Sequence, residues 1–200
     1  MELLLPQSCA GCRMPGHHLC PECQTRLRQV PQRIVTPVNP HVPLWSLGPY
    51  AGAHRGVILA MKERNNRAVR GILGPVLAAA IRHLQVRGEL IDAPVLVPAP
   101  TRPRSARLRG GDHVTGVCRA SGMPVVVALC HGAGVRDQVG LDAQQRRSNL
   151  AGSLVLRSIP TGPVLLVDDV VTTGSTLAAS TEVLLAAGCQ VVGGLVLSHA

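Results

Sequence analysis

Short runs of consecutive apolar residues alternate along this chain with segments whose apolar residues recur at helical spacing. The runs Val95-Leu96-Val97 and Val164-Leu165-Leu166-Val167 are typical of strands that are buried on both faces. Further strands are expected over residues 44–50, 123–129, 152–157 and 190–197. Helices are expected over residues 53–63, 68–84 and 112–121, and from the end of segment 172–176 up to the capping residue Gly188. This alternation predicts an α/β domain with a mostly parallel sheet flanked by helices, in which ligands bind at the carboxyl ends of the strands.

The predicted helix over residues 68–84 contains two conflicting signals. Val69, Leu73 and Val76 belong to an apolar stripe that indicates a buried face. The Gly74-Pro75 pair interrupts that stripe, because proline removes a backbone donor and its ring crowds the preceding turn. We therefore expect either a kink or a second helix that starts at this pair.

The composition limits the partners that the chain can have. Two hundred residues suit one domain of ordinary size with a small appendage. The formal net charge is +9, and Lys62 is the one lysine among the twenty basic residues. Excess positive charge favours anionic partners, either phosphorylated small molecules or nucleic acid. Trp45 and Tyr50 are the only aromatic residues, which argues against a platform that stacks on the bases of single strands.

The apolar runs are too short for a transmembrane segment. A membrane-spanning helix needs about 20 predominantly apolar residues, and no run in this sequence approaches that length. The N-terminal Met-Glu-Leu-Leu-Leu-Pro has a short apolar stretch without a basic lead, so a signal peptide is not expected. A cytoplasmic location is the expectation.

Two cysteine pairs near the N-terminus have the spacing of a metal site. Cys9 with Cys12, and Cys20 with Cys23, each form a Cys-x₂-Cys pair. Four thiolates suit a tetrahedral Zn²⁺, which would be structural because no coordination position stays open. His17 and His18 could compete as ligands, and two disulfides are the alternative, which a reducing compartment disfavours. Segment 24–45 is rich in proline and indicates a linker or extended arm. We expect a zinc-binding module with its linker over 1–43 and an α/β domain over 44–200.

Polar residues with a specific order follow the apolar run at 164–167. Asp168 and Asp169 come first, and the segment Thr172, Thr173, Gly174, Ser175 and Thr176 precedes the last predicted helix. Backbone N–H groups and hydroxyls at a helix N-terminus can hold a phosphate, and glycine lets the backbone approach an oxyanion. The two carboxylates could accept hydrogen bonds from ribose hydroxyls and help to place Mg²⁺. The alternative is a buried strand that ends in a polar turn and a capped helix.

A basic loop follows the apolar run at 95–97. Arg102, Arg104, Arg107 and Arg109 lie close together and are followed by Gly110-Gly111. These arginines repel one another unless an anion lies between them, although a solvated basic loop is the alternative. Lys62 is a second candidate for a phosphate contact, since an ammonium acts as a compact point charge. The glycine-rich and polar segment 131–150 is expected to be a hood that closes over the site.

Several of these motifs resemble known proteins. Residues 168–176 resemble the phosphoribosyl-pyrophosphate (PRPP) loop of the type I phosphoribosyltransferases. The chain as a whole resembles the ComF family, in which paired cysteines precede a phosphoribosyltransferase domain. The resemblance also includes Tyr50 with Lys62, Val97-Pro98-Ala99-Pro100, Arg107-Leu108-Arg109-Gly110 and Gln138-x₂-Leu141-x₄-Arg146-x₂-Asn149. Many family members have Phe-Asn-Gln where this chain has Gly111-Asp112-His113.

The resemblance implies a type I phosphoribosyltransferase fold that binds PRPP, or a nucleotide-like small molecule, together with Mg²⁺. Asp168 and Asp169 would hold the ribose hydroxyls, and residues 172–176 would hold the 5′-phosphate. Arg109, Gly110 and Lys62 would face the pyrophosphate. The acidic pair and Arg109 would support displacement of pyrophosphate by a nitrogen nucleophile, with no residue that stands out as a general base. The alternative implied by the same family is a non-catalytic protein of DNA uptake and competence that binds DNA and senses PRPP or a nucleotide.

Overall fold

The structure, a computed structural model, describes residues 8–91, 93–101, 112–132 and 154–200. The helices are α1 (Pro21–Leu27), α2 (Gly52–Lys62), α3 (Ala68–Val86), α5 (His113–Ala120) and α7 (Ser175–Ala186). The strands are β1 (Gln32–Arg33), β2 (Leu44–Ser46), β3 (Val95–Pro98), β4 (Leu129–His131), β5 (Leu154–Leu156), β6 (Val164–Val171) and β7 (Val191–His199). Among these helices, none is both long enough and apolar enough to cross a membrane.

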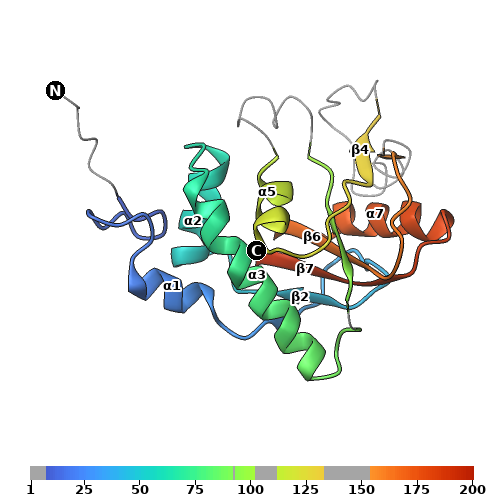
Figure 1. Cartoon of the computed structure of the whole chain (residues 1–200), viewed down its shortest axis with the longest axis horizontal. Helices are drawn as coiled ribbons and strands as arrows, with labels where there is room; N and C mark the ends of the chain where they lie inside the picture. Colours follow the sequence, from blue (N-terminus) through green and yellow to red (C-terminus); the bar gives the residue numbers. More distant parts are fainter. Residues whose placement is uncertain (1–7, 92, 102–111, 133–153) are drawn as a thin grey trace.

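A five-stranded, mostly parallel sheet forms the centre of the molecule (Figure 1). Its strand order is β1-β2-β7-β6-β3, with parallel pairing throughout except for β1, which runs antiparallel to β2 at one edge. Strands β4 and β5 form a separate antiparallel pair. The predicted α/β class with a mostly parallel sheet is therefore confirmed.

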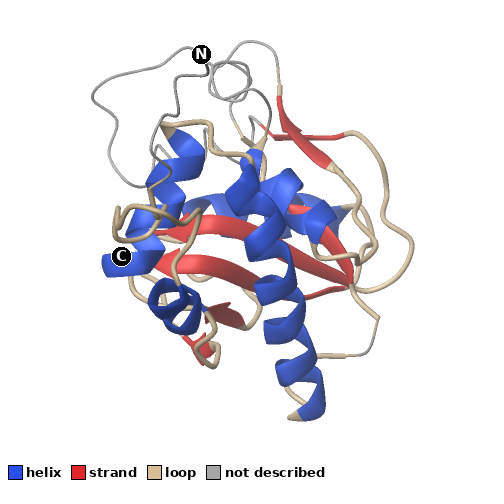
Figure 2. Ribbon diagram, turned by 60° about the vertical axis from the view of Figure 1, so that its left-hand side comes forward, coloured by secondary structure: helices blue, strands red, loops and turns tan. Residues whose placement is uncertain are grey.

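Helices cover both faces of the main sheet (Figure 2). Because side chains alternate along a strand, Leu165 and Val167 of β6 face the core beneath α2, α3 and α5, whereas Val164 and Leu166 face the core beneath α7. All four side chains are fully buried. The continuous apolar run therefore reflects burial on both faces of the strand, as the sequence predicted.

Two predicted strands have different bounds in the structure. Strand β2 ends at Ser46, so the strand expected over 44–50 is shorter than predicted. The segment 123–129 is not a regular strand, because its pairing with β3 is confined to one isolated bridge between Val125 and Leu96. In that bridge the Leu96 N–H donates to the Pro124 carbonyl at 2.8 Å, and the chain forms a strand again only from Leu129, in β4.

Helix α3 is continuous through Pro75, so the expectation of a second helix starting at Gly74-Pro75 is wrong. The helix packs against α5 at this point. A Cβ atom on Gly74 would lie 2.3 Å from the carbonyl carbon of Ala120, so the two helices approach through bare backbone. Burial of the apolar stripe of α3 outweighs the backbone hydrogen bond that Pro75 removes.

The N-terminal module lies beside α2, at the end of the molecule remote from α7 (Figure 1). A Cβ atom on Gly56 of α2 would lie 2.0 Å from the carbonyl oxygen of Gly11, so this contact is also made by backbone. Strand β1, which lies within the predicted linker, pairs with β2 and so joins the main sheet. The domain boundary between residues 43 and 44 stays a prediction.

Two glycines of α3 make a matched pair for testing this packing. We expect Gly74→Ala to lower the free energy of unfolding by more than about 2 kcal/mol, because the added methyl group overpacks the contact with Ala120. Gly71→Ala should raise it by about 0.5–1 kcal/mol, since its methyl group meets open space and alanine favours helix. Urea unfolding of both variants checks this. Equal effects would contradict the close approach of α3 and α5.

Candidate functional site

The acidic pair lies within β6 rather than after it. The strand continues to Val171, so the predicted end of the strand at Asp168 is wrong. Asp168 pairs with Val196 of β7, and the pairing continues to Val171 opposite His199. Both carboxylates are therefore held by a hydrogen-bonded strand, close to the carboxyl end of the sheet where ligands bind in open α/β folds.

Asp169 is a buried carboxylate that binds side chains from two helices. Lys62 at the end of α2 places its Nζ 2.8 Å from Asp169 Oδ1. His113 at the start of α5 forms a hydrogen bond between its Nε2 and Asp169 Oδ2. Asp169 is 6% exposed and His113 is 1% exposed. Three elements that are distant in sequence therefore meet at one carboxylate.

The pKa values of the two carboxyl groups are shifted in opposite directions. Burial alone would raise the pKa of Asp169, but the hydrogen bond with His113 and the charge of Lys62 outweigh it and hold that pKa below its usual range. Burial, together with the charge of Asp169, raises the pKa of Asp168 to about 8. The N–H of Asp169, which donates to Asp168 Oδ1 at 2.8 Å, only partly offsets that rise. At neutral pH the pair thus holds one carboxylate and one carboxylic acid, and a ligand cation would favour ionisation of the second.

Residues 172–176 form a turn that leads into α7. Gly174 has φ = +86° and occupies the N-cap position, a conformation that glycine adopts without strain. The hydroxyls of Thr173 and Ser175 lie 2.9 Å apart, and Thr172 and Thr173 are exposed. The first turn of α7 follows at once, so backbone N–H groups and the hydroxyls of Thr173 and Ser175 lie together at a helix N-terminus. This arrangement suits an anion such as phosphate.

The segment 34–43, here called the arm, supports this turn from behind. The Val38 N–H donates to the Thr173 carbonyl at 2.8 Å. The Thr36 hydroxyl donates to the Val38 carbonyl at 2.7 Å. A Cβ atom on Gly174 would lie 2.5 Å from Thr36 Oγ1, so glycine is also required by the closeness of the arm. This contact could not be predicted from the sequence, because it joins segments more than a hundred residues apart.

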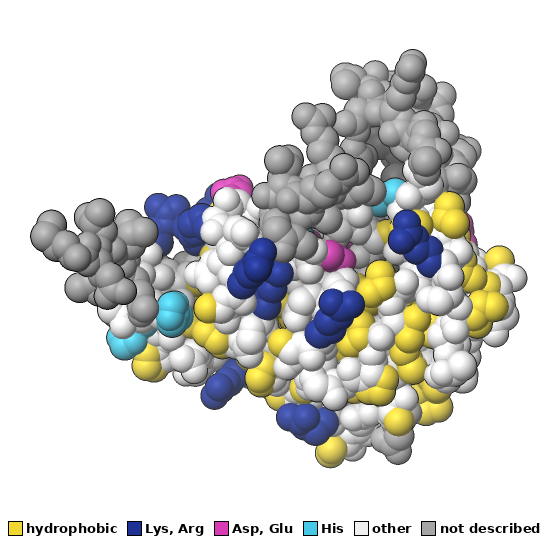
Figure 3. Space-filling model, turned by 45° about the horizontal axis from the view of Figure 1, so that its top comes forward, with side chains coloured by type: hydrophobic (Ala, Val, Ile, Leu, Met, Phe, Trp, Pro, Cys, Tyr) yellow, Lys and Arg dark blue, Asp and Glu magenta, His cyan; other side chains and the backbone are white. Residues whose placement is uncertain are grey.

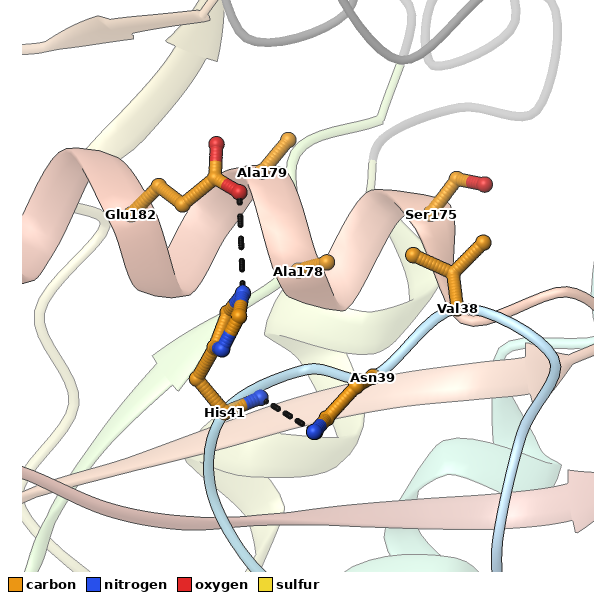
Figure 4. A pocket seen from close by; sticks show the side chains of 7 residues that line it. All are labelled: Val38, Asn39, His41, Ser175, Ala178, Ala179 and Glu182. Carbon is orange, nitrogen blue, oxygen red and sulfur yellow. Dashed lines mark hydrogen bonds and ion pairs between the residues drawn. The ribbon is translucent and has the colours of Figure 1, made fainter. Parts of the chain in front are cut away.

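The arm continues along α7 and leaves a cavity of about 170 Å³ between them (Figure 4). The N–H of His41 donates to the side chain of Asn39 at 2.8 Å, and His41 Nε2 lies 3.9 Å from Glu182 of α7. The cavity is lined by Val38, Asn39, His41, Ser175, Ala178, Ala179 and Glu182. The segment predicted as a linker is therefore part of the wall around the turn at 172–176.

Other predicted site residues lie outside the described residues. These are Arg109 and Gly110, the preceding Arg102, Arg104 and Arg107, and most of the predicted hood at 131–150. The helix after the basic loop is described, and Asp112 is its N-cap. The Asp112 carboxylate accepts hydrogen bonds from the Val114 N–H at 3.0 Å and from the Thr115 hydroxyl at 2.6 Å.

His113 is the site residue that sequence reasoning did not find. Its position in the sequence showed only a departure from the Phe-Asn-Gln of related chains. In the structure its side chain is buried, and its Nδ1 has no hydrogen-bond partner among the described residues. The signal that could have identified His113 is its place as an ionisable residue at the start of a helix, directly after a basic loop.

The four N-terminal cysteines form one compact group. Their Sγ atoms all lie within 4.8 Å of one another, and all four are free thiols, so the disulfide alternative is not observed. Neither His17 nor His18 belongs to this group. A tetrahedral site with Zn–S bonds of about 2.3 Å separates its sulfurs by about 3.8 Å. The Cys12 and Cys20 sulfurs lie 3.6 Å apart, so the donor set fits zinc.

The thiols of this group differ in acidity. Burial would raise the pKa of Cys9, but backbone hydrogen bonds from Cys20, Cys12 and Gly11 outweigh it and lower that pKa to about 6. Burial and the neighbouring cysteines raise the pKa of Cys23. A divalent cation would allow all four to ionise, because thiolates are the species that bind metal.

Three comparisons with known proteins relate to the α/β domain. The family model described as the phosphoribosyl transferase domain matches residues 120–199, which include β6, the turn and α7. Two crystal forms of a hypoxanthine phosphoribosyltransferase from Staphylococcus aureus are similar at 13% identity and a TM-score of 0.35. The overlap covers 66% of this chain and 63% or 62% of that enzyme's chain, slightly less than two thirds of its length. None of the curated proteins matches this chain.

The mostly parallel sheet flanked by helices agrees with the fold of the phosphoribosyl transferase domain that the family model describes. The acidic pair of β6 and the turn that follows it lie within the matched range. The four-cysteine group lies outside that range and could hold a zinc ion.

Substitution of Asp168 and substitution of Asp169 should change the free energy of unfolding in opposite directions. We expect Asp169→Asn to lower the free energy of unfolding by about 3 kcal/mol at pH 7, because Lys62 and His113 lose their buried partner. Asp168→Asn should raise it by more than about 1 kcal/mol at pH 9 and hardly at pH 4. The folded pKa of Asp168, about 8, exceeds its unfolded value, so the wild type loses stability as pH rises from about 4 to about 8.

Urea unfolding of the two variants at pH 4, 7 and 9 measures these differences. An Asp168→Asn variant whose stability relative to the wild type does not depend on pH would contradict the raised pKa. An Asp169→Asn variant with the same free energy of unfolding as the wild type would show that the burial of Lys62 and His113 does not require that carboxylate.

The cysteine group should bind one equivalent of zinc. We expect Cys23→Ser to lose most of the metal, since Cys23 is buried within the group. Cys189→Ser should retain it, because Cys189 lies outside the group. Elemental analysis of purified protein after dialysis gives the zinc content. Metal-free wild type that fails to take up zinc, or equal loss in both variants, would contradict the assignment.

Proposed function

We propose that this chain is a ComF-like phosphoribosyltransferase-domain protein that binds PRPP with Mg²⁺ and transfers phosphoribose to or from a nitrogen base. The family match supports a phosphoribosyltransferase-type function. One observation carries the proposal: a paired, buried carboxylate and a phosphate-suited turn occupy the end of the same strand, β6.

Different residues of the described site would bind different groups of the PRPP ligand. Thr172, Thr173 and Ser175, with the first N–H groups of α7, would hold the 5′-phosphate. Asp168 and Asp169 lie upstream of that turn on β6 and would accept hydrogen bonds from the ribose hydroxyls. Carboxylate oxygens also suit Mg²⁺, and a cation beside Asp168 would offset the burial that raises its pKa.

In the proposed reaction, a nitrogen lone pair attacks the anomeric carbon while the bond from that carbon to pyrophosphate breaks. Pyrophosphate leaves with the bonding electrons, and the bound metal would supply charge stabilisation there. Lys62 would add positive charge, because its side chain stays 28% exposed while its ammonium is paired with Asp169. His113 would fix the orientation of Asp169. Arg109 and Gly110, which the structure does not describe, remain proposed partners of the pyrophosphate.

Titration calorimetry with Mg²⁺ and PRPP tests this proposal. We expect zinc-loaded wild type to bind and the Asp168→Asn/Asp169→Asn double variant to lose at least tenfold in affinity. Because Asp169→Asn should reduce stability, Asp168→Asn alone serves as the well-folded variant. Binding by the wild type justifies a screen of nitrogen bases for pyrophosphate release. No binding at millimolar PRPP would exclude the transferase function.

The second candidate function is a role in DNA uptake or processing, with PRPP or a nucleotide as the sensed ligand. It is favoured by the net charge of +9 and by the Lys and Arg side chains spread over the face shown in Figure 3, where acidic side chains are sparse. Affinity for DNA that falls steeply as salt rises would support it, since phosphate contacts release counterions. Absence of binding at low salt would exclude it.

The arm offers a conservative test of the phosphate-binding turn. We expect Thr36→Val to weaken binding of ribose 5-phosphate about two- to tenfold, because it removes one hydrogen bond behind the turn. Val35→Thr is the matched control, since Val35 is 97% exposed. The amide signal of Gly174 in NMR spectra reports the binding. Equal affinities would show that the arm does not position the turn.

A further inference from the structure

A second cavity lies at the junction between the cysteine module and α2, away from the acidic pair of β6. Its volume is about 250 Å³. It is lined by Gly11, Cys12, Arg13, Gly52, Arg55, Gly56, Leu59 and Arg64. The site proposed for PRPP uses Lys62, Asp168 and Asp169, none of which lines this cavity, so the two sites are distinct.

Three of the lining residues are arginines that come from different segments. Arg13 follows the first cysteine pair, Arg55 lies in α2, and Arg64 follows the end of α2. Within the described residues, none of the three forms an ion pair with a carboxylate, and no carboxylate lines the cavity. Guanidinium groups that share one cavity repel one another unless an anion lies between them.

The backbone around the cavity is open to a ligand. Gly11 and Gly56 touch through bare backbone, and space beside Gly52 is free, because a Cβ atom there would meet nothing within 4 Å. The Nη2 atom of Arg64 lies 3.4 Å from the carbonyl oxygens of Ala10 and Gly56, which anchors its guanidinium across the junction. The cavity therefore combines the guanidinium donors of the three arginines with a glycine-rich wall, which leaves room for a ligand.

Arg13 occupies a backbone conformation that costs free energy for any residue with a side chain. Its φ is +69°, in the left-handed region where glycine fits best. The turn that imposes this φ is fixed by hydrogen bonds from the Arg13 N–H to the Cys9 carbonyl at 2.8 Å and from the Cys9 N–H to the Met14 carbonyl at 2.7 Å. An arginine thus lines the cavity at a position where glycine would be less strained.

We propose that this cavity is a second anion site, which binds a phosphate group through Arg13, Arg55 and Arg64. A phosphate has the charge and the several acceptor oxygens that three forked guanidinium groups can share, and a cavity of about 250 Å³ admits it. The phosphate group belongs either to a free phosphorylated compound or to a nucleic-acid backbone.

A zinc tetrathiolate beside Cys12 offers a competing explanation. Four thiolates around one Zn²⁺ carry a net charge of −2, which arginines could neutralise without any ligand. Three guanidinium groups exceed that charge by one, and an external anion would complete the balance. The two explanations differ in whether added phosphate changes the arginine environment while zinc stays bound.

The test uses the zinc-loaded full chain labelled with ¹⁵N-arginine. Inorganic phosphate is added at constant ionic strength, with chloride as the reference salt, and the Nε–Hε signals are recorded. We expect the signals of Arg13 and Arg55 to shift and saturate with phosphate, and Arg55→Gln to weaken the Arg13 response at least fivefold in Kd. Arg82→Gln is the matched control, since Arg82 is an exposed arginine of α3. The amide of Gly174 reports phosphate at the other proposed site separately.

Two further additions identify the source of the phosphate. A 5′-mononucleotide and an oligonucleotide without terminal phosphates are compared with inorganic phosphate, and the probe that saturates the arginine signals at the lowest concentration gives the source. Arginine signals that respond to phosphate no more than to chloride would overturn the proposal. So would an Arg55→Gln variant that binds zinc normally and leaves the Arg13 response unchanged. Signals that move only when zinc is removed would assign the arginines to charge compensation alone.

Discussion

The buried carboxylate of Asp169 is the interaction on which the rest of this site depends. Lys62 and His113 reach it from α2 and α5, so one side chain of β6 fixes two helices over the end of the sheet. A buried carboxylate with two such partners stays ionised, whereas its neighbour Asp168 forms no ion pair within the described part of the chain and has a pKa of about 8. The two carboxyl groups therefore differ in acidity before any ligand binds. A ligand that brings a cation to Asp168, or hydroxyl donors to Asp169, meets groups that are already oriented.

The arm adds a second constraint, which acts on the turn at 172–176. Val38 and Thr36 hold the turn at Thr173 and Gly174, and strand β1 joins the arm to the sheet through β2. The cysteine module precedes the arm in the chain and packs against α2, the helix that ends at Lys62. The N-terminal third of the molecule thus contacts both the turn and the helix that contributes the lysine. The arm and the cysteine module themselves precede the range that matches the phosphoribosyl transferase domain.

Features governed by local sequence could be predicted, and those governed by distant contacts could not. The apolar run at 164–167, the C-terminal cap at Gly188 and the four-cysteine group follow from burial, backbone conformation and metal-ligand spacing. His113 and Asp169 are 56 residues apart, so their contact depends on how α5 packs on the sheet. The continuity of α3 depended on the close approach of Gly74 to Ala120. The strand expected over 123–129 was wrong because its apolar residues meet β3 at only one bridge.

The single lysine of the chain allows the most direct test of the central claim, that Asp169 and Lys62 form part of a phosphoribose site. Protein labelled with ¹³C-lysine gives one side-chain signal, from Lys62, which can be followed while Mg²⁺ and PRPP are added. The account predicts that this signal moves to a new, saturating position, because the ligand takes up hydrogen bonds at Asp169 and brings phosphate charge close to the ammonium. A Lys62 signal that stays unchanged while the Gly174 amide reports bound ligand would contradict it.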